Sequence, residues 1–425
     1  MAIRGLRRAD SASDADIVVF NTCTVTASAD QDARSAIRRV HRENPNTKIM
    51  VTGCYAQRAH KEVAALPGVT WVVGNSHKHH VAEIAASSQQ QARARQDFVS
   101  LEQVTLSAPA FTLIGDIFAH TELIAAPLFA GDNYTEKTRP NLKVQDGCNN
   151  RCSFCIIPSV RGRSRSMGLE RVVAEATALV HNGYHEIVLS GINLGRWGRD
   201  LQPQQRLEQL LRALLEETAI EKIRISSVEP MDWSDNLIAL VAGSPRIAKH
   251  AHAPLQSGSD RMLRAMRRRY RPWHYAEKIR KIREAMPLAA IGADVMTGFP
   301  GETDELSEVS RSFIERLPFT YLHVFTYSSR PGTPSAAMPN QVSIHVARER
   351  NRILRELAAE KNLEFRRQFV GKTLDVITLH QDDAKSTEAL SDNYLKVRLL
   401  APYAANQVMS ANITGIGADN LVGHA

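Results

Sequence analysis

Cysteine is scarce in this sequence, and long apolar runs are missing. Only 5 of the 425 residues are cysteine, and three of these fall within the eight residues from Cys148 to Cys155. A secreted disulfide framework would distribute its cysteines along the chain, so that class of protein is excluded. The longest apolar candidate, Leu123 to Ala130, is interrupted by Pro127 and is far shorter than the ~18 consecutive apolar residues of a membrane helix. We therefore expect no membrane span.

Motifs of several other protein classes are also missing. The sequence contains no Gly-x4-Gly-Lys phosphate-binding loop, no hydrolase nucleophile elbow and no fixed-period repeat. The first residues are basic, but no apolar segment follows them, which is not the pattern of a secretory signal. These absences predict a cytoplasmic protein. In a reducing compartment, clustered thiols indicate metal binding.

The composition is that of a globular protein with a basic balance. Hydrophobic residues make up 43% and charged residues 23% of the sequence, and its length predicts two or three domains. The 53 Lys and Arg residues against 45 Asp and Glu residues give a net charge of +8. This charge favours a polyanionic partner such as RNA, and dispersed surface charge accounts for it equally well.

Strand and helix patterns alternate near the start of the chain, as expected for an open α/β layer. Short β-branched apolar runs predict parallel strands at Asp16–Asn21, Lys48–Gly53 and Val69–Gly74. Helical spacing predicts helices at Ala29–Asn44 and His80–Ser88. Cys23 and Cys54 come just past strand ends, where open α/β sheets place their ligands. From Ser87 to Arg139 the pattern degrades, which predicts a linker into a second domain.

From Lys143 onward, strand and helix patterns alternate in six successive units. The predicted strands are Lys143–Gln145, Glu186–Ser190, Lys222–Ser226, His250–Pro254, Ile291–Met296 and Tyr321–Phe325. The predicted helices are Leu169–Asn182, Leu207–Thr218, Ser234–Ala242, Ser259–Met266, Tyr275–Ala285 and Glu305–Arg316. Six β/α units in series predict a parallel barrel or partial barrel, whose chemistry belongs at the carboxyl ends of the strands.

A long predicted helix, Val346–Phe369, leads into a terminal segment with little helical signal. Its strand patterns lie at Thr373–Leu379, Leu395–Leu399 and Ala411–Ile416. Short strands of this kind predict a small β-barrel that binds oligonucleotides. The sequence thus predicts an α/β protein with three domains: an open α/β domain with its linker at residues 1–135, a partial (β/α)6 barrel at 136–368 and a small β-barrel at 369–425.

The strongest chemical signal is the C-x3-C-x2-C spacing of Cys148, Cys152 and Cys155, directly after the first predicted barrel strand. A four-iron cluster needs a thiolate on each iron to be fully capped, so three thiolates leave one iron open. S-adenosylmethionine can chelate that iron through its amino and carboxylate groups, so that an electron from the cluster cleaves the sulfonium and yields a 5'-deoxyadenosyl radical. The alternatives are a structural zinc site, which would need a fourth Cys or His nearby, and three incidental cysteines.

These residues resemble the radical-SAM methylthiotransferase family. The segment from Gln145 to Pro158 and the arginine-rich run Arg161–Ser166 are most similar to the branch that acts on N6-threonylcarbamoyladenosine in tRNA. Four further segments carry the resemblance: Leu189–Gly195, His252–Ser259, Thr297–Thr303 and His323–Ser328. The match runs over nearly the whole chain. It implies an N-terminal methylthiotransferase domain, a central radical-SAM barrel and a C-terminal TRAM domain.

The resemblance also implies a reaction, its cofactors and its partners. One S-adenosylmethionine donates a methyl group to a sulfur held at a second 4Fe-4S cluster. Another supplies the radical that removes hydrogen from C2 of the adenine ring. The product is a 2-methylthio adenosine beside the anticodon. The expected partners are therefore tRNA and a reducing electron donor, with no DNA and no membrane.

Two turns after barrel strands are candidates for holding S-adenosylmethionine. Gly191 and Asn193 follow the second predicted strand, where a backbone turn and a polar side chain can grip the amino group. Gln256 and Ser257 follow the fourth strand, where they can hydrogen-bond the ribose. A glycine after a strand is otherwise only a turn, so the prediction depends on the common placement of these residues.

The second cluster has fewer candidate ligands than the resemblance implies. Cys23 and Cys54 match two of three cysteine positions, and the third should lie in an earlier strand. Only 22 residues precede Cys23, and none is cysteine. We expect either a shortened version of a longer protein or an incomplete auxiliary site. Buried structural thiols are the alternative reading of these two cysteines.

Three functions are compatible with the sequence. The first, favoured by the Gln145–Cys148 and Arg161–Ser166 segments, is methylthiolation of N6-threonylcarbamoyladenosine near the anticodon. The second is methylthiolation by a related branch, of a ribosomal-protein aspartate or of isopentenyladenosine in tRNA. The third is an inactive tRNA-binding relative. Candidate RNA contacts are Arg161, Arg163, Arg165, Lys372, Lys385, Asn393, Tyr394, Lys396 and Arg398.

Overall fold

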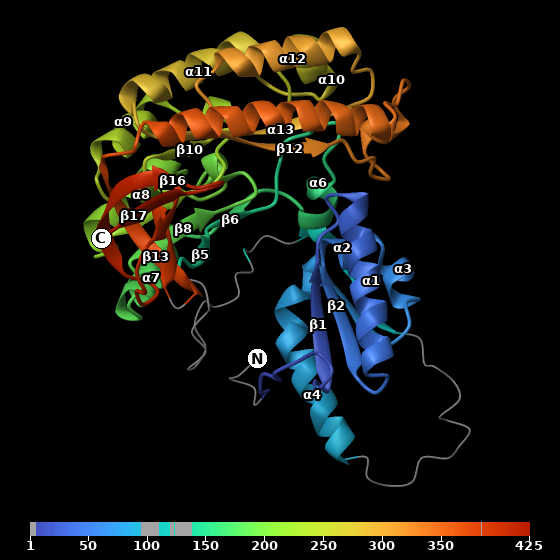
Figure 1. Cartoon of the computed structure of the whole chain (residues 1–425). Coiled ribbons are helices and arrows are strands. Elements are labelled where there is room, and N and C mark those ends of the chain that lie inside the picture. Colours follow the sequence, from blue (N-terminus) through green and yellow to red (C-terminus); the bar gives the residue numbers. More distant parts are fainter. Residues whose placement is uncertain (1–5, 95–109, 120–122, 124–137, 384) are drawn as a thin grey trace. The chain divides into compact units, whose positions relative to one another are not determined.

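A computed structural model of the chain describes residues 6–94, 110–119, 123, 138–383 and 385–425 (Figure 1). The chain falls into two compact units. The first contains residues 1–134, 147–163 and 328–336, and the second contains residues 135–146, 164–327 and 337–425. Most of the predicted linker from Ser87 to Arg139 lies outside the described residues. Within the described ranges, no helix has both the length and the apolar character that a bilayer crossing requires.

The first unit is built on a parallel sheet with strand order β1-β2-β3-β4. The strands are β1 (Ile17–Thr22), β2 (Lys48–Gly53), β3 (Val69–Gly74) and β4 (Phe111–Leu113). The helical segments are α1 (Ala27–Glu43), α2 (Cys54–Arg58), α3 (His60–Ala64), η2 (Asn75–His80), α4 (Val81–Ala94), η3 (Ile117–Ala119) and α6 (Ile157–Arg161). The predicted open α/β layer is confirmed.

Helices cover both faces of this sheet. Successive side chains of a strand point to opposite sides, and here both sides carry apolar residues that need covering. Ile49 of β2 packs in one core with Ile37 of α1, whereas its neighbour Met50 packs in another with Val81 of α4. Figure 1 shows α1 and α4 on opposite sides of β1 and β2. The first turn of α1 is capped by Thr26, whose Oγ1 accepts a hydrogen bond from the backbone N of Ala29 at 3.1 Å.

The second unit contains six parallel strands in sequence order, arranged as the sheets β5-β8-β9 and β10-β11-β12. A parallel bridge between Ile223 and Ile247 connects β9 to the segment before β10. The strands are β5 (Asn141–Lys143), β8 (Glu186–Ser190), β9 (Lys222–Ile225), β10 (His250–His252), β11 (Ala290–Thr297) and β12 (Tyr321–Thr326). The helices between them are α7 (Leu169–His181), α8 (Leu207–Glu217), α9 (Asp235–Gly243), α10 (Asp260–Ala265), α11 (Pro272–Ala285) and α12 (Asp304–Arg316). This is the alternation predicted for a partial barrel.

The C-terminal part of the second unit follows the long helix α13 (Ile344–Arg367). Five strands close into a barrel in the order β13-β14-β15-β17-β16, which confirms the predicted small β-barrel. They are β13 (Thr373–Asp383), β14 (Ser386–Ser391), β15 (Lys396–Leu399), β16 (Val408–Ile416) and β17 (Leu421–His424). Phe365, near the end of α13, and Phe369, just after it, belong to the same apolar core as Val397 and Leu399 of β15.

A buried arginine ties the partial barrel to the small barrel within this unit. Arg224 of β9 donates through Nε to Oε1 of Glu186 at 2.7 Å, and both side chains are 3% exposed. The same guanidinium donates to the carbonyl oxygens of Ser391 and Asp392, at 3.1 and 3.0 Å. One cation therefore satisfies a buried carboxylate and two main-chain acceptors.

We expect Arg224→Ala to lower the free energy of unfolding by about 3–5 kcal/mol, because it leaves the Glu186 carboxylate buried without its main partner. Urea denaturation followed by circular dichroism measures the change. Arg171→Ala is the control, because Arg171 pairs with Glu175 on an exposed helix face. That variant should change stability by less than about 0.5 kcal/mol. Equal stability of the two variants would contradict the expectation.

Candidate functional site

The loop from Gly147 to Arg163 of the first unit carries the three clustered cysteines. Gly147 has φ +70°, and a Cβ at this position would lie 1.9 Å from the carbonyl oxygen of Arg163. Only glycine therefore permits this close approach of the two ends of the loop. A hydrogen bond from the backbone N of Cys148 to the O of Gly162, at 3.1 Å, closes the loop.

The thiols of Cys148, Cys152 and Cys155 are half-buried in this loop. The backbone N of Cys155 donates to the O of Cys152 at 3.2 Å, which fixes the turn between them. The backbone N of Ser335 donates to the O of Ser153 at 2.9 Å and anchors the middle of the loop. Thiolate sulfur is the donor that iron–sulfur clusters use, so the donor set of this loop fits such a cluster.

Cys54 lies at the start of α2 in a buried, polar environment. Its Sγ accepts a hydrogen bond from Nε of Arg161 at 3.0 Å and one from Nδ2 of Asn75 at 3.4 Å. It also packs with Ile156 and Val160, on either side of the start of α6. Two side-chain donors therefore hold the sulfur of Cys54 in place, and cysteine sulfur is the ligand atom of iron–sulfur clusters.

Cys23 and Cys54 come from the same edge of the sheet in the first unit. Thr22, Gly53 and Gly74 are aligned across β1, β2 and β3, so Cys23 and Cys54 each follow an aligned position. Cys23 is exposed and Cys54 is buried. The corresponding residue after β3 is Asn75, the donor to Cys54, so no thiol follows that strand.

A buried carboxylate fixes the segment that follows Cys23. Asp30 accepts hydrogen bonds from Oγ1 of Thr24 at 2.6 Å and from Nη2 of Arg58 at 2.8 Å, and it forms a further ion pair with Arg330. Arg58 also donates to Thr24 through Nε at 2.7 Å. These contacts tie the turn after β1 to α2, the helix that begins with Cys54.

A glutamine side chain shapes the turn after β8 in the second unit. Oε1 of Gln145 accepts a hydrogen bond from the backbone N of Asn193 at 2.7 Å, and its Nε2 donates to Oγ of Ser164 at 2.9 Å. A Cβ at Gly191 would lie 2.9 Å from this same Oε1, so the turn has no room for a larger residue. The predicted S-adenosylmethionine contacts Gly191 and Asn193 therefore lie in a tightly defined turn.

Gln256 adopts a backbone conformation that is uncommon for a residue with a side chain. Its φ is +67°, and its backbone N donates to the O of Asp294 at 2.8 Å. The side chain is buried, and its Oε1 has no hydrogen-bond partner among the described residues. Buried acceptors without a partner are uncommon in folded proteins, so this atom is open to a hydrogen bond from a ligand or a water molecule. Its neighbour Ser257 is fully buried, and Oγ of Ser257 accepts from the N of Ser259 at 3.2 Å.

A cavity of about 630 Å³ opens in the second unit among the barrel strands. Strand residues of β8 to β12 and residues of the small barrel line it, and a volume of this size accommodates a small-molecule group such as a nucleobase. The lining residues are Thr138, Arg139, Asn141, Val188, Arg224, Ile225, Ser226, Ser227, His250, His252, Asp294, Tyr321, His323, Leu379 and Tyr394.

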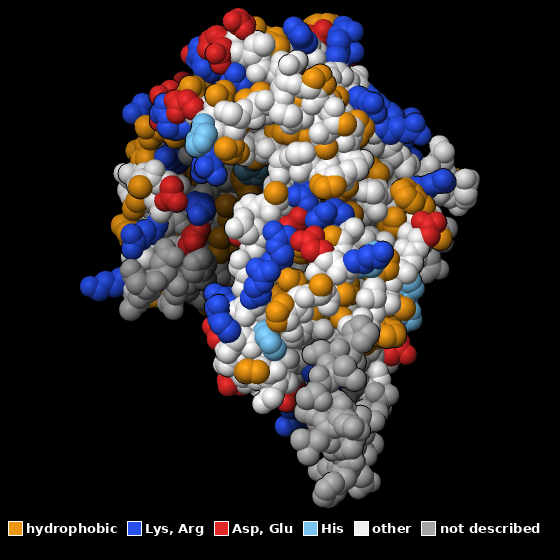
Figure 2. Space-filling view, turned by 90° about the vertical axis from the view of Figure 1, so that its right-hand side faces the viewer, with side chains coloured by type: hydrophobic (Ala, Val, Ile, Leu, Met, Phe, Trp, Pro, Cys, Tyr) orange, Lys and Arg blue, Asp and Glu red, His pale blue; other side chains and the backbone are white. Residues whose placement is uncertain are grey.

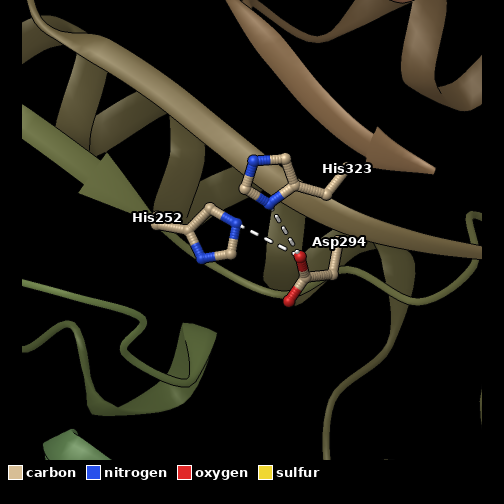
Figure 3. A group of neighbouring side chains, drawn as sticks. All are labelled: His252, Asp294 and His323. Atoms are coloured by element: carbon tan, nitrogen blue, oxygen red, sulfur yellow. Dashed lines mark hydrogen bonds and ion pairs between the residues drawn. The ribbon is translucent and has the colours of Figure 1, made fainter. Parts of the chain in front are cut away.

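Two histidines and a carboxylate meet in this cavity (Figure 3). Oδ1 of Asp294 lies 3.4 Å from Nε2 of His252 and 3.3 Å from Nδ1 of His323. The other ring nitrogen of His252, Nδ1, is 2.6 Å from Oγ of Ser227, which orients the ring. Burial favours the neutral carboxyl, but the two histidines beside it outweigh burial and hold the pKa of Asp294 well below its usual value. The three donor atoms also lie close enough together to hold a metal ion.

His250, in the same cavity, is buried and neutral. Its Nε2 is 2.6 Å from the hydroxyl of Tyr321. Burial first, and the charge of Arg224 second, lower the pKa of His250 well below 6.5. In the unfolded chain His250 takes up a proton near pH ~6.5. In the folded protein it takes up a proton only at a lower pH. Stability contributed by this residue is therefore present above pH ~6.5 and is lost as the pH falls below that value.

We expect the stability of the parent to fall more steeply between pH 7.5 and pH 5.5 than that of His250→Gln, by about 1 kcal/mol. Asp294 does not obscure the comparison. Its lowered pKa contributes stability that is lost only as the pH falls below ~3.9, the pKa of an unfolded aspartate. Guanidinium denaturation at the two pH values gives the difference. Identical slopes for the two proteins would show that His250 takes up its proton over the same pH range in the folded and unfolded states.

The structure divides the predicted RNA contacts into exposed and inward-facing groups. Arg165 is 7% exposed, and Nδ2 of Asn393 donates to the O of Leu288 at 3.1 Å. The ring of Tyr394 stacks with that of His250, with centroids 4.5 Å apart. Among the predicted contacts on the small barrel, Lys372, Lys385, Lys396 and Arg398 are exposed, and Tyr394 is 37% exposed although its ring stacks on His250. On the face shown in Figure 2, Lys and Arg side chains are interspersed with Asp and Glu side chains, so charge there is dispersed.

Two protein-family models and several known proteins match this chain. The Radical SAM superfamily matches residues 142–312, and Uncharacterized protein family UPF0004 matches residues 1–74. Threonylcarbamoyladenosine tRNA methylthiotransferase MtaB of Bacillus subtilis is 38% identical over 92% of this chain and 84% of its own length. The enzyme of that name from Aquifex aeolicus is 36% identical over 90% of this chain and 87% of its own length. The tRNA-2-methylthio-N(6)-dimethylallyladenosine synthase of Thermobifida fusca is 35% identical over 90% of this chain and 74% of its own length.

Solved structures share the fold of the chain. The radical S-adenosylmethionine methyltransferase TsrM from Kitasatospora setae, solved with cobalamin and a [4Fe-4S] cluster, superposes with a TM-score of 0.57. The match covers 77% of this chain and 67% of that protein, at 15% sequence identity. At this identity the likeness extends to the fold alone.

Proposed function

The chain belongs to the methylthiotransferase family that carries a radical SAM domain, and we propose that it converts N6-threonylcarbamoyladenosine of tRNA to its 2-methylthio derivative. The observation that carries the proposal is identity of 38% over 92% of the chain to a protein of that activity. The cysteine loop from Cys148 to Cys155 supplies the donor set that a radical SAM enzyme needs.

In this proposal Cys148, Cys152 and Cys155 hold a 4Fe-4S cluster through three irons. When bound, that cluster supplies the electron that cleaves S-adenosylmethionine at its open iron. The protein's own contribution is to position the thiols, through the close approach at Gly147 and the turn between Cys152 and Cys155.

The turn at Gly191 and Asn193 and the residues Gln256 and Ser257 are proposed contacts of S-adenosylmethionine. Gln145 shapes the turn, and the orphaned Oε1 of Gln256 is available as an acceptor for an amino or hydroxyl group of the ligand. Preorganised acceptors of this kind orient a ligand without a cost in side-chain ordering at binding.

A second 4Fe-4S cluster on Cys23 and Cys54 is proposed as the sulfur-bearing site. Its support is the common strand-end placement of the two cysteines and the donation from Arg161 to the sulfur of Cys54. Two thiolates cap only half of the irons, so other ligands must complete this cluster.

The three predicted domains take separate roles in this proposal. Residues 1–135 carry the second cluster, residues 136–368 generate the radical and residues 369–425 bind tRNA. Exposed Lys372, Lys385, Lys396 and Arg398 on the small barrel support the last role, because phosphate contacts by Lys and Arg provide most nonspecific affinity for nucleic acids. An external donor supplies the electron.

A second candidate substrate is dimethylallyladenosine, because synthases of its 2-methylthio derivative are 34–35% identical to this chain. The deciding experiment uses anaerobically reconstituted protein, S-adenosylmethionine and a reductant. It compares tRNA that carries threonylcarbamoyladenosine with tRNA that carries dimethylallyladenosine. Mass spectrometry of the nucleosides is expected to show a 2-methylthio product from the first tRNA only. Product from the second alone would replace the proposed substrate, and product from neither would refute the activity.

A further inference from the structure

The cavity among the barrel strands has a polar wall that no part of the proposed chemistry uses so far. Alternate residues of three neighbouring strands point into it: His250 and His252 from β10, Asp294 from β11, and Tyr321 and His323 from β12. Because side chains alternate along a strand, these residues share the inner face of the barrel. They come from strands far apart in the sequence.

The strands that line this cavity lead to the residues proposed to contact S-adenosylmethionine, all within the second unit. The O of Asp294 accepts hydrogen bonds from the backbone N of Leu255 at 3.1 Å and of Gln256 at 2.8 Å. Val188, which lines the cavity, lies in β8 three residues before Gly191. The cavity and the proposed cosubstrate contacts therefore belong to the same strands and to the turns that follow them.

The cavity contains a cation that its neighbours leave weakly paired. Nη1 of Arg139 lies 3.4 Å from Oε1 of Glu186, and the same carboxylate oxygen is only 2.7 Å from Nε of Arg224. Glu186 is thus neutralised mainly by Arg224. The Arg139 side chain is 22% exposed and lines the cavity. A guanidinium in this position is suited to bind a carboxylate through two parallel hydrogen bonds.

The group of His252, Asp294 and His323 offers complementary hydrogen-bonding atoms. The Asp294 carboxylate is an acceptor, and each histidine ring can donate or accept. Nε2 of His252 is buried without a well-aligned hydrogen bond among the described residues, although it lies 3.4 Å from Asp294. A ligand with both donors and acceptors would satisfy these atoms, whereas an apolar ligand would bury them unsatisfied.

We propose that this cavity is the subsite for the polar N6 substituent of the substrate adenine, with Arg139 bound to its carboxylate and the His252–Asp294–His323 group hydrogen-bonded to its hydroxyl and urea-like groups. The inference rests on the proposed function and adds the residues that select the substrate. The threonylcarbamoyl group has a carboxylate, a hydroxyl and amide-type donors and acceptors. A dimethylallyl group has none of these, so it leaves the wall of the cavity desolvated and unpaired.

The test is equilibrium binding by the cluster-reconstituted full chain. Three anticodon stem-loop RNAs are compared, identical except for threonylcarbamoyladenosine, dimethylallyladenosine or unmodified adenosine at one position. The parent is expected to bind the first at least about 10-fold more tightly than the other two, because sites built to hydrogen-bond a polar group reject analogues that lack it. Arg139→Gln and His323→Ala are each expected to bring this preference to within about twofold.

Matched variants separate selection from folding. His185→Ala changes an exposed histidine outside the cavity, which pairs with Glu221, and should keep the full preference. Arg139→Lys retains the charge but not the planar fork, so it should keep part of the preference. Far-ultraviolet circular dichroism and iron content verify that each variant is folded and loaded.

The outcomes distinguish this inference from the function on which it rests. A parent that prefers the threonylcarbamoyl RNA but forms no 2-methylthio product would refute the function and leave the subsite standing. A parent that forms product while its preference is absent, or is unaffected by Arg139→Gln and His323→Ala, overturns the subsite. If a chelator abolishes the preference and a divalent cation restores it, a metal ion occupies the three donors and the direct contact to substrate is wrong.

Discussion

Replacing Cys152 with alanine is expected to abolish reductive cleavage of S-adenosylmethionine. Each thiolate of the loop caps one iron in the proposed cluster, so this variant leaves two irons without a protein ligand. We expect the loss of about four irons per chain after anaerobic reconstitution. Formation of 5'-deoxyadenosine should fall more than about 1,000-fold, as when an interdependent catalytic unit loses one member. Colorimetric iron analysis and liquid chromatography measure the two quantities.

The control for this prediction lies one residue away. Arg151 is exposed in the same loop, so Arg151→Ala changes the loop without removing a proposed ligand. Its iron content and its rate of 5'-deoxyadenosine formation should stay within about twofold of the parent. If Cys152→Ala kept its full iron content, and Cys148→Ala and Cys155→Ala did the same, the cluster would have to be held elsewhere.

Elements with a strong local pattern were predictable from the sequence. Residues 186–190 are a strand with the predicted bounds, and the helix predicted at Leu169–Asn182 is observed at Leu169–His181. β14 and β17 were missed. β14 has the sequence Ser-Thr-Glu-Ala-Leu-Ser, with little β-branched or aromatic content, and it is a strand because barrel closure pairs it on both sides. Tertiary pairing of this kind is not visible in a local pattern.

The cysteine candidates were predictable because their spacing is local, whereas the cavity was not. His252, Asp294 and His323 are each separated by tens of residues; His252 ends β10, and the other two lie within β11 and β12. Only the parallel register, which aligns Ala293 with Leu322 and Asp294 with His323, brings them together. The alternation of His250 and His252 was the one available signal, since two polar residues at a spacing of two predict one polar face of a strand.

The orphaned acceptor on Gln256 was also beyond sequence reasoning, although the residue itself was predicted. Its position after a barrel strand was visible in the sequence, but its φ of +67° and its unsatisfied Oε1 depend on the bridge to Val295 in β11. The sequence therefore predicted where Gln256 lies in the fold, whereas its unsatisfied side-chain oxygen is visible only in the packed structure.

Replacing Cys54 with serine is expected to separate two activities that the parent combines. Serine keeps the size of the side chain and its contact with Ile156 and Val160, but a neutral hydroxyl is a poor ligand for iron. Formation of the 2-methylthio nucleoside should fall more than about 100-fold, since loss of an outer-shell partner alone costs 10–100-fold in a metal site. Formation of 5'-deoxyadenosine, which depends on the other three cysteines, should stay within about threefold. Both products are quantified in one reaction by mass spectrometry.

A second variant tests whether the contact between Arg161 and the sulfur of Cys54 matters for methylthiolation. Its Nε donates to Cys54 Sγ at 3.0 Å, so Arg161→Gln should weaken the second site while the thiol remains. A methylthiolation rate about 10-fold lower, with the radical step intact, is the expected result of losing such a partner. If Cys54→Ser and Arg161→Gln both kept the parent rate of methylthiolation, Cys54 would be a structural thiol, because neither its sulfur nor the cation beside it would matter to the transfer. If both variants lost 5'-deoxyadenosine formation as well, the two cysteine groups would not function as separate centres.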